Sequence, residues 1–211
     1  MTIEPTAPRW MDWAARLNAI AQIGLTFARD PFDIQRYTAI RQIAAEIIAE
    51  SGLGSIDQIA GTLAEQIGYA TPKVDVRCAI FAENRILLVR ERSDGKWTLP
   101  GGWADVRESL RESAIKEVRE ESGYEVEAVK LIAVDDRNKH PHEPQYINHV
   151  YKCFVLCKIK GGSPQTSDET DGVEFFPEHE LPELSLARVT AEQIARAFLH
   201  YRNPHFATEF D

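Results

Sequence analysis

Three glutamates near the end of one predicted helix are the residues of this chain best suited to chemistry. Glu117, Glu120 and Glu121 lie three and four positions apart in the segment KEVREESGY. On an α-helix this spacing puts side chains on one face, within an arc of about 100°. Such like charges repel, and a helix end favours cations. The group therefore favours a divalent cation, Mg²⁺ or Mn²⁺, with a solvated acidic face as the alternative.

The helix that carries these glutamates has clear ends in the sequence. Ser109 and Glu112 have the spacing of a capping box, which predicts that the helix begins at the residue after Ser109. Gly123 predicts its end, because glycine readily adopts the left-handed conformation that terminates helices. Ala114 and Val118 share one side, so that side is expected to pack on a core while the adjacent flank presents the carboxylates.

The wider pattern resembles the Nudix box, G-x5-E-x7-R-E-U-x-E-E-x-G-U, in which U is a bulky apolar residue. Gly102, Glu108 and the run from Lys116 to Tyr124 keep every spacing of that pattern. Lys116 stands where the general pattern has arginine, and lysine keeps the positive charge but loses the bidentate fork. The resemblance implies an α+β fold, the α/β/α sandwich of that family. It also implies cleavage of a phosphoanhydride in a nucleoside diphosphate linked to another group X.

The same resemblance implies a role for each residue of the box. The expected metal ligands are three carboxylates and one backbone carbonyl: Glu117, Glu120, Glu121 and Gly101. Glu120 is expected to bind directly or through water. Glu108 is expected to act as a further carboxylate at or behind the metal, and Lys116 to orient a glutamate. Glu121, Glu120, Glu108 and Lys116 are therefore candidate catalytic residues.

A general base is expected either from the box or from a distant acidic loop. The segment SDETDGVEFF offers Asp168, Glu169 and Asp171 just before a predicted strand. We expect Glu169 to be the catalytic base, although a base must also lie within hydrogen-bond reach of the attacking water. The alternative for the whole segment is an acidic surface loop.

Basic and aromatic residues near the box are the candidates for holding the substrate. Arg90 and Arg92 alternate onto one face of the strand ILLVRER, where each could grip a phosphate or face solvent. Trp97 and Trp103 bracket the segment TLPGG and could stack on a base or pack against the turn.

Two histidines in the polar loop RNKHPHEPQY are further candidates. His140 and His142 have the H-x-H spacing of a metal-binding pair, but no cysteine or further histidine follows at the spacing of zinc ligands. We therefore expect this loop to contact the substrate, with an inert polar loop as the alternative.

The chain is predicted to form two domains. Residues 1–70 show three helices by apolar periodicity and capping signals. Asp30 before Pro31 predicts the start of the second helix, and a capping box of Ser55 and Gln58 predicts the start of a third helix that ends at Gly68. The apolar positions of the first helix recur at helical spacing: Trp13, Leu17, Ile20 and Ile23. We expect residues 1–70 to form a helical domain that joins two copies into a homodimer. A DNA-binding unit is the alternative, but this part of the chain has no basic stripe.

Residues 71–211 are expected to form the Nudix domain. Strands are predicted at 74–81, 85–91, 125–136, 147–159 and 172–177, with a short strand within 95–102 and a closing helix at 190–202. Strands, one central helix, more strands and a final helix indicate an α+β arrangement.

Composition narrows the partners and the location. The 211 residues carry a net charge of −9, which disfavours a polymeric nucleic acid but permits a small nucleotide bridged by a divalent cation. No apolar run reaches membrane-spanning length and no signal peptide is evident. Cys78, Cys153 and Cys157 form no CxxC pair and are expected to be buried, reduced thiols. We therefore expect no membrane partner and a cytoplasmic location.

Segments outside the box resemble one subgroup of the Nudix family. RLNAIAQIGLTFARDPFDIQRY and LVRERSDGKWTLPGGW resemble a Nudix subgroup that pairs an N-terminal helical domain with activity on ADP-ribose-like or CDP-choline-like substrates. We expect a Mg²⁺- or Mn²⁺-dependent pyrophosphatase that releases a nucleoside monophosphate and phospho-X. One alternative is a nucleotide- or ADP-ribose-sensing module with weak or no turnover. The other is a pyrophosphohydrolase or nuclease acting on RNA 5′ ends.

Overall fold

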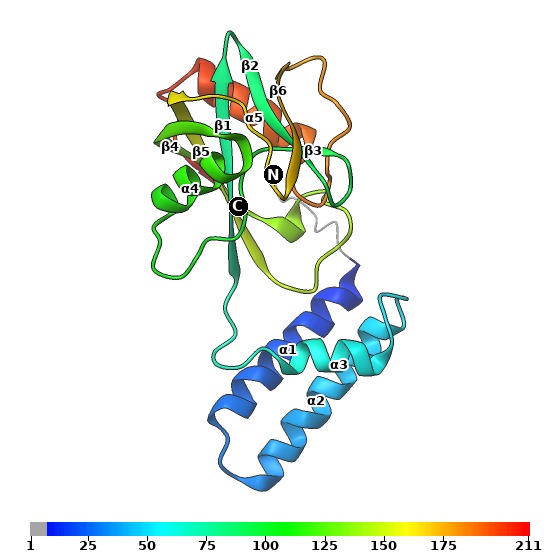
Figure 1. Ribbon diagram of the computed structural model, residues 1–211. Coiled ribbons are helices and arrows are strands. Elements are labelled where there is room, and N and C mark those ends of the chain that lie inside the picture. The colour runs from blue at the N-terminus through cyan, green and yellow to red at the C-terminus, as the bar shows by residue number, and fades with distance from the viewer. Residues whose placement is uncertain (1–7) are drawn as a thin grey trace. The chain divides into compact units, whose positions relative to one another are not determined.

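Three helices form the N-terminal part of the described chain, which covers residues 8–211 of a computed structural model (Figure 1). They are α1 (Arg9–Phe27), α2 (Pro31–Ala49) and α3 (Ile56–Ala64). Asp30 caps α2 by accepting hydrogen bonds from two backbone N–H groups, and Ser55 forms the predicted capping box of α3 with Gln58. The start signals are therefore confirmed, whereas α3 ends four residues before Gly68, where its end was predicted.

The buried face of α1 is formed mostly by small and polar side chains: Met11, Ala14, Asn18, Ala21 and Gln22. Trp13 and Ile20, two members of the apolar stripe predicted for this helix, are 49% and 54% exposed. The reason is steric, because α1 and α2 approach closely: a Cβ added at Gly24 would lie 2.4 Å from the ring of Tyr37. Close helix packing favours small residues at the contact and leaves the bulky ones outside.

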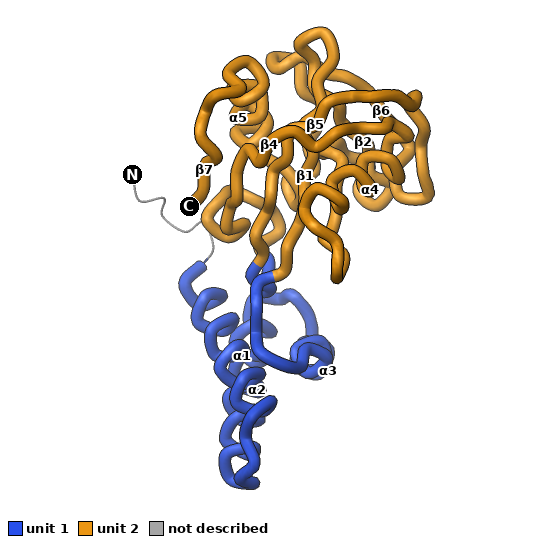
Figure 2. The backbone as a smooth tube through the Cα atoms, turned by 90° about the vertical axis from the view of Figure 1, so that its left-hand side faces the viewer, with its two compact units in different colours: residues 1–72, 146–149 blue, residues 73–145, 150–211 orange. Residues whose placement is uncertain are grey.

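The chain divides into two units (Figure 2). Unit 1 contains residues 8–72 of the described chain together with 146–149, and unit 2 contains residues 73–145 and 150–211. The strand predicted to begin at Ile147 begins at Val150 instead, because Ile147 packs against the apolar core of the helices. Within residues 8–211, no helix is both long enough and apolar enough to cross a membrane.

Unit 2 is built on a mixed sheet with the strand order β3-β2-β1-β5-β4-β7, in which β6 also pairs with β2. The strands are β1 (Lys73–Ala82), β2 (Arg85–Glu91), β3 (Trp97–Thr98), β4 (Tyr124–Asp136), β5 (Val150–Gly162), β6 (Thr170–Pro177) and β7 (Glu209–Phe210). The central pair β1 and β5 is parallel, and β5 and β4 are antiparallel. A short 3₁₀ helix (Arg137–Lys139) follows β4.

Two helices pack on this sheet and form two separate cores. Helix α4 (Leu110–Ser122) contributes Ala114 and Val118 to one core, with Val76 of β1. Helix α5 (Ala191–Arg202) contributes Ile194 and Phe198 to the other, with Ala79 of β1. Alternate residues of β1 thus serve different cores, as expected of a strand covered on both faces. The predicted α/β/α arrangement is confirmed (Figure 1).

Candidate active site

One cavity of about 430 Å³ brings together residues from three distant segments. Its lining comes from the turn before α4, from α4 itself and from the loop before β6: Gly102, Trp103, Asp105, Glu117, Glu120, Glu121, Ser167, Asp168 and Glu169. The three predicted metal-binding carboxylates and the predicted base therefore lie around the same space.

Local sequence signals position the helix that carries the carboxylates. Ser109 and Glu112 form both hydrogen bonds of the capping box at the start of α4. Gly123 ends the helix in the left-handed conformation, with φ of 74°, and its N–H donates to the carbonyl of Arg119. Both predicted helix ends are confirmed, and they place Glu117 and Glu121 in the last turns of α4.

The glycine turn before the helix lets its backbone touch two of these carboxylates. Gly101 donates its N–H to Oε2 of Glu121 at 2.8 Å. Its φ is 142°, and an added Cβ would lie 1.9 Å from the carbonyl oxygen of Val76, so only glycine fits. A Cβ on Gly102 would lie 2.7 Å from Oε2 of Glu117. Gly102 therefore leaves room for the carboxylate of Glu117, and Gly101 lets the turn lie close against β1.

The same turn is held against β1 by its carbonyls. Pro100 accepts a hydrogen bond from the N–H of Cys78, and Gly102 accepts one from the N–H of Val76, both at 2.8 Å. Within residues 8–211, the intervening carbonyl of Gly101 accepts no hydrogen bond. A carbonyl of this kind suits the metal-ligand role expected for Gly101.

Burial shifts the protonation of the carboxylates toward neutral pH. Burial raises the pKa of Glu121 to about 8, against the opposing charge of Arg77 and the hydrogen bond from Gly101. Burial also raises the pKa of Glu117 to about 7. Arg77 opposes that rise, and the charges of Glu120 and Glu169 add to it. Clustered carboxylates that hold protons near pH 7 are well suited to exchange those protons for a divalent cation. The residues present therefore fit Mg²⁺ or Mn²⁺.

Comparison with known proteins decides the family. Residues 71–198 match the model described as the NUDIX domain. This chain belongs to the Nudix family. Residues 8–63 match a second model, described as a UDP-X-like N-terminal oligomerisation domain.

Relatives of this Nudix hydrolase span both units. A putative ADP-ribose pyrophosphatase, YjhB of Bacillus subtilis (strain 168), is 43% identical over 96% of this chain and 97% of its own length. The crystal structure of a UDP-X diphosphatase has a TM-score of 0.62 and 33% identity, covering 96% of this chain and 98% of that chain. An ADP-ribose pyrophosphatase from Streptococcus suis 89-1591 has a TM-score of 0.62 and 45% identity, covering 67% of this chain and all of that chain.

The lysine that departs from the Nudix pattern is paired at the start of the box. Lys116 forms an ion pair with Asp105 and lies 3.5 Å from Oε1 of Glu108. Glu108 also accepts a hydrogen bond from Ser113 at 3.1 Å and does not line the cavity. Lys116 therefore contacts a glutamate of the box. That glutamate is Glu108, which lies outside the cavity lining. The catalytic roles expected for Lys116 and Glu108 stay predictions.

Both candidate phosphate-binding arginines of the Nudix domain hold the acidic segment at the start of β6. Arg90 pairs with Asp171, the second residue of β6, at 2.6 Å. Arg92 donates from its side chain to the carbonyl of Ser167 and from its backbone to the carbonyl of Glu169. The arginines thus fix the loop that carries the predicted base, and their expected contact with phosphate stays a prediction.

The two tryptophans have different surroundings. Trp97 packs edge to face with Phe176, at 4.8 Å between ring centroids, and a Cβ on Gly172 would lie 2.9 Å from its ring. The ring of Trp97 therefore packs within the protein, which was the alternative to stacking on a substrate base. Trp103 is 48% exposed and lines the cavity, so it is the aromatic residue available to a substrate.

His142 is corrected from a substrate contact to a buried structural residue. It is fully buried, its Nδ1 lies 2.8 Å from the carbonyl oxygen of Leu186, and its Nε2 lies 3.2 Å from Nε2 of Gln193. This network assigns the proton to Nδ1, so Nε2 accepts from the Gln193 amide. Burial lowers the pKa of His142 to about 3, which keeps the ring neutral. The loop folds inward here because both ring nitrogens find partners.

His140 lies in a second acidic group, outside the Nudix box. Its Nε2 is 3.3 Å from Asp211 and 3.6 Å from Asp135, and possible ligand atoms of the three residues lie within 4.8 Å of one another. Asp135 already accepts hydrogen bonds from Gln193 and Arg196, at 3.0 and 2.5 Å. Arg196 therefore compensates the charge of Asp135, the buried member of this group. The substrate contact expected of His140 stays a prediction.

Sequence reasoning missed one buried charge beside the Nudix carboxylates. Arg77 of β1 is 6% exposed and is bonded to Asp75 through two nitrogen atoms. A signal was present, because Asp75 and Arg77 are opposite charges that share one face of an otherwise apolar strand.

Proposed function

We propose that this Nudix hydrolase is a divalent-metal-dependent pyrophosphatase for a nucleoside diphosphate linked to X. It splits the substrate into a nucleoside monophosphate and phospho-X, and ADP-ribose-like and UDP-X-like molecules are the preferred substrate classes. The observation that carries the proposal is the convergence of Glu117, Glu120 and Glu121 with Glu169 around one cavity. The activities for which the relatives are named support the choice of substrates.

The metal-binding residues follow from the site. Glu117, Glu120 and Glu121, together with the carbonyl of Gly101, would hold Mg²⁺ or Mn²⁺, because hard oxygen ligands suit these ions. When bound, the cation neutralises the diphosphate and lowers the pKa of a water molecule. The N–H of Gly101 fixes one oxygen of Glu121 and leaves the other oxygen for the cation.

Glu169 is the proposed general base. It lines the cavity, and both polar groups of its backbone are hydrogen-bonded. Its N–H donates to Oγ of Ser167, and its carbonyl accepts from the N–H of Arg92. Asp171 is engaged by Arg90 and does not line the cavity, which favours Glu169 over it. Its proposed task is to accept the proton of the attacking water.

Trp103 is the proposed platform for the base or ring of the substrate. Its ring is half-exposed at the cavity that holds the carboxylates. Lys73 places its ammonium 5.9 Å from the centroid of that ring, which adds positive charge beside the place where a phosphate group would enter.

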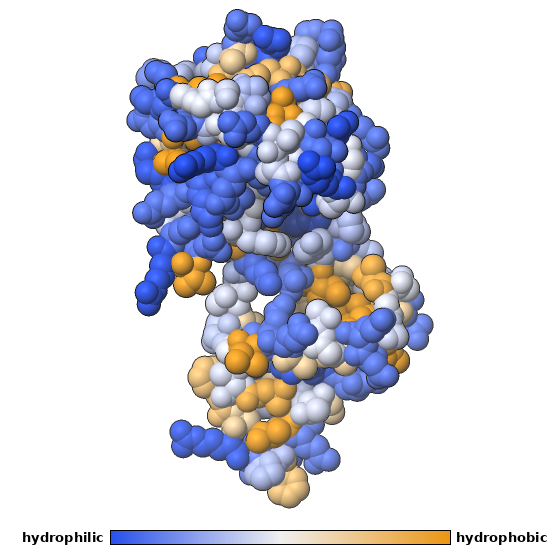
Figure 3. Space-filling model, in the orientation of Figure 1, coloured by the Kyte–Doolittle hydropathy of each residue, from blue (hydrophilic) through white to orange (hydrophobic). Residues whose placement is uncertain are grey.

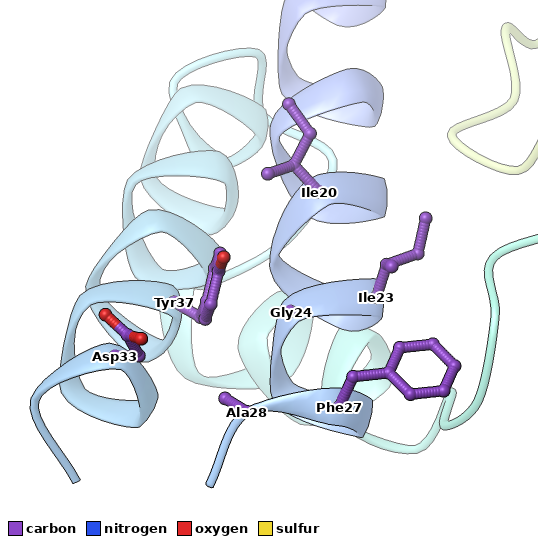
Figure 4. Close-up of a pocket in the computed structure, with 7 residues that line it drawn as sticks. All are labelled: Ile20, Ile23, Gly24, Phe27, Ala28, Asp33 and Tyr37. Atoms are coloured by element: carbon purple, nitrogen blue, oxygen red, sulfur yellow. The ribbon is translucent and has the colours of Figure 1, made fainter. Parts of the chain in front are cut away.

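We also propose that two copies associate through unit 1. Trp13, Ile20 and Phe27 lie seven residues apart on α1 and are 49%, 54% and 65% exposed. A seven-residue spacing puts them on one face, and Figure 3 shows apolar residues gathered on the helices of unit 1. An open groove of about 450 Å³ lies beside them, lined also by Ile23 and Tyr37 (Figure 4). An exposed apolar face of this extent is typical of an interface.

A substrate panel tests the proposed reaction. ADP-ribose, UDP-sugars, CDP-choline, free nucleoside triphosphates and triphosphorylated RNA are incubated with the full chain in Mg²⁺ or Mn²⁺, and products are resolved by chromatography. Release of a nucleoside monophosphate from a diphosphate-linked substrate is the expected result. Binding of ADP-ribose without hydrolysis would favour a nucleotide-sensing module. Preferential cleavage of RNA 5′ ends would favour an RNA pyrophosphohydrolase or nuclease. The cytoplasmic location stays a prediction.

A further inference from the structure

A buried group of three charged side chains lies on β1 and β5, behind the glycine turn. Asp75, Arg77 and Lys152 are 4%, 6% and 2% exposed. Arg77 donates from Nε and Nη2 to the two oxygens of Asp75, at 3.1 and 2.8 Å, and the ammonium of Lys152 binds the same carboxylate. One negative charge therefore stands against two positive charges. A buried net charge is costly unless another anion compensates it.

Glu91 and Glu121 are the other buried carboxylates near this group. Glu91 is already paired with Arg188 at 2.9 Å. Glu121 is 5% exposed and is bound by the N–H of Gly101 in the turn. The turn therefore lies between the charged group of β1 and β5 and the carboxylate of α4.

Hydrogen bonds connect Arg77 to Glu121 through that turn. Nη1 of Arg77 donates to the carbonyl of Leu99 at 3.3 Å, and two residues later the N–H of Gly101 donates to Glu121. The backbone N–H groups on either side of Arg77 bind the carbonyls of Pro100 and Gly102. The turn is therefore held at successive residues, and its position relative to α4 depends on the strand that carries Arg77.

We propose that Arg77 is a positioning residue of the metal site, which holds the turn from Leu99 to Gly102 in place and thereby places the N–H of Gly101 that binds Glu121. This inference rests on the metal dependence proposed above. Arg77 is too buried to grip the substrate itself, so it acts through the turn and the carboxylates. Its loss is expected to weaken metal binding and turnover more than it weakens nucleotide binding.

Two variants at Arg77 and one control test the proposal in the full chain. Arg77→Met removes the charge but leaves Asp75 and Lys152 as a neutral pair, so the fold is expected to survive. Arg77→Lys keeps the charge and loses the fork. Arg85→Met is the control, because Arg85 is exposed on the neighbouring strand and pairs only with Glu83 among the residues described. Electron paramagnetic resonance of free Mn²⁺ measures the dissociation constant, and near-ultraviolet circular dichroism reports the fold.

The expected result is a ranked loss of Mn²⁺ affinity. Arg77→Met is expected to raise the Mn²⁺ dissociation constant by about 10- to 100-fold and to lower kcat similarly, with a smaller change in KM. Arg77→Lys is expected to lie between Met and wild type, and Arg85→Met to match wild type.

The other outcomes overturn specific statements. A folded Arg77→Met protein with wild-type Mn²⁺ affinity and kcat overturns the role of Arg77. If Arg77→Met does not fold, the test is made with the Arg77→Lys protein. A folded Arg77→Lys protein with wild-type Mn²⁺ affinity and wild-type kcat overturns the role of Arg77. A wild-type chain that binds no Mn²⁺ overturns the metal dependence itself, and the role of Arg77 falls with it.

Discussion

Gly101 and Glu121 are joined by a hydrogen bond of 2.8 Å from the backbone N–H of the first to Oε2 of the second. This bond ties the turn before α4 to the last turn of the helix, so that the proposed metal-binding carboxylate and the carbonyl of Gly101 share one fixed geometry. Activity and stability are both expected to depend on it.

Gly101→Ala is expected to abolish most activity. Its Cβ would collide with the carbonyl of Val76 at 1.9 Å and the backbone φ of 142° would be strained, so the turn must move. Displacing the site costs about 100-fold or more in kcat, and the strain costs about 2 kcal/mol in the free energy of unfolding. Kinetics and thermal unfolding measure both. The control is Gly61→Ala in α3, where the added methyl meets open space and is expected to be neutral or stabilising.

Glu121→Gln is expected to remove turnover while preserving the fold. The amide still fits beside Gly101, but it lacks the charge that holds a divalent cation. We expect a loss of at least about 100-fold in kcat and loss of Mn²⁺ binding measured by calorimetry. Exhaustive chelation of the wild-type chain should have the same effect and be reversed by added Mg²⁺ or Mn²⁺. Full activity after chelation would argue against the proposed function.

The metal-free protein is expected to lose stability as the pH rises from 6.5 to 7.5. Burial raises the pKa of Glu121 to about 8, far above its usual value, so the unfolded chain has released this proton while the folded chain still holds it. Raising the pH therefore favours unfolding, by about 1 kcal/mol over this window for Glu121 alone. Glu117 is only partly buried and its pKa is raised to about 7, so it adds less in the same direction because solvent screens it.

Other groups contribute little in that window. The pKa of His142 is lowered to about 3 by burial, so its destabilising effect begins only below about pH 6.5, where the unfolded chain takes up a proton. Burial lowers the pKa of Lys152 to about 8, so it stays mostly charged. Denaturant unfolding in chelator at the two pH values measures the slope. Glu121→Gln should flatten it, and an equally steep slope in that variant would contradict the assignment.

Glu169→Gln is expected to lower kcat by about 10²- to 10⁴-fold with little change in KM, as befits loss of a general base. The matched control is Asp171→Asn, which removes a carboxylate of the same loop that is paired with Arg90 and lies outside the cavity lining. Equal losses in both variants would indicate that the loop, and not one carboxylate, matters.

Ile20→Glu in α1 is expected to convert a dimer into a monomer. Ile20 is the middle residue of the exposed stripe between Trp13 and Phe27, and a charge there cannot be buried against a second copy without a partner. Light scattering coupled to gel filtration gives the mass. Val129→Glu on β4 is the control, since Val129 is also 53% exposed but lies in unit 2. An unchanged mass for Ile20→Glu would exclude this face as the interface.

Local signals in the sequence predicted the parts of the site that depend on neighbouring residues. The capping box of Ser109 and Glu112 and the terminating Gly123 gave α4 its correct ends, and the spacing of the glutamates gave their common face. Glu169 was placed correctly beside them only through the resemblance, because no periodicity connects a loop to a helix so distant in the sequence.

The features that the sequence did not predict depend on contacts between residues that are far apart in the chain. Periodicity showed that Trp13 and Ile20 share a face of α1, but not that smaller residues would form the helix contact. His142 looked like a loop residue because its partners, Leu186 and Gln193, are far along the chain. Arg77 was missed although its partner Asp75 is only two residues away, because its contact with the carbonyl of Leu99 joins segments that are distant in the sequence.

The four residues 146–149 have a practical consequence for separating the two units. Ile147 packs into the helical core, and Asn148 accepts a hydrogen bond from Gln66 at 3.0 Å, so the chain returns to unit 1 between two strands of the sheet. A single cleavage after Pro72 would therefore strip these residues of their neighbours and expose an apolar side chain. The two units are therefore interleaved in the chain. Neither unit can be isolated by a single cut without the loss of residues that it packs against.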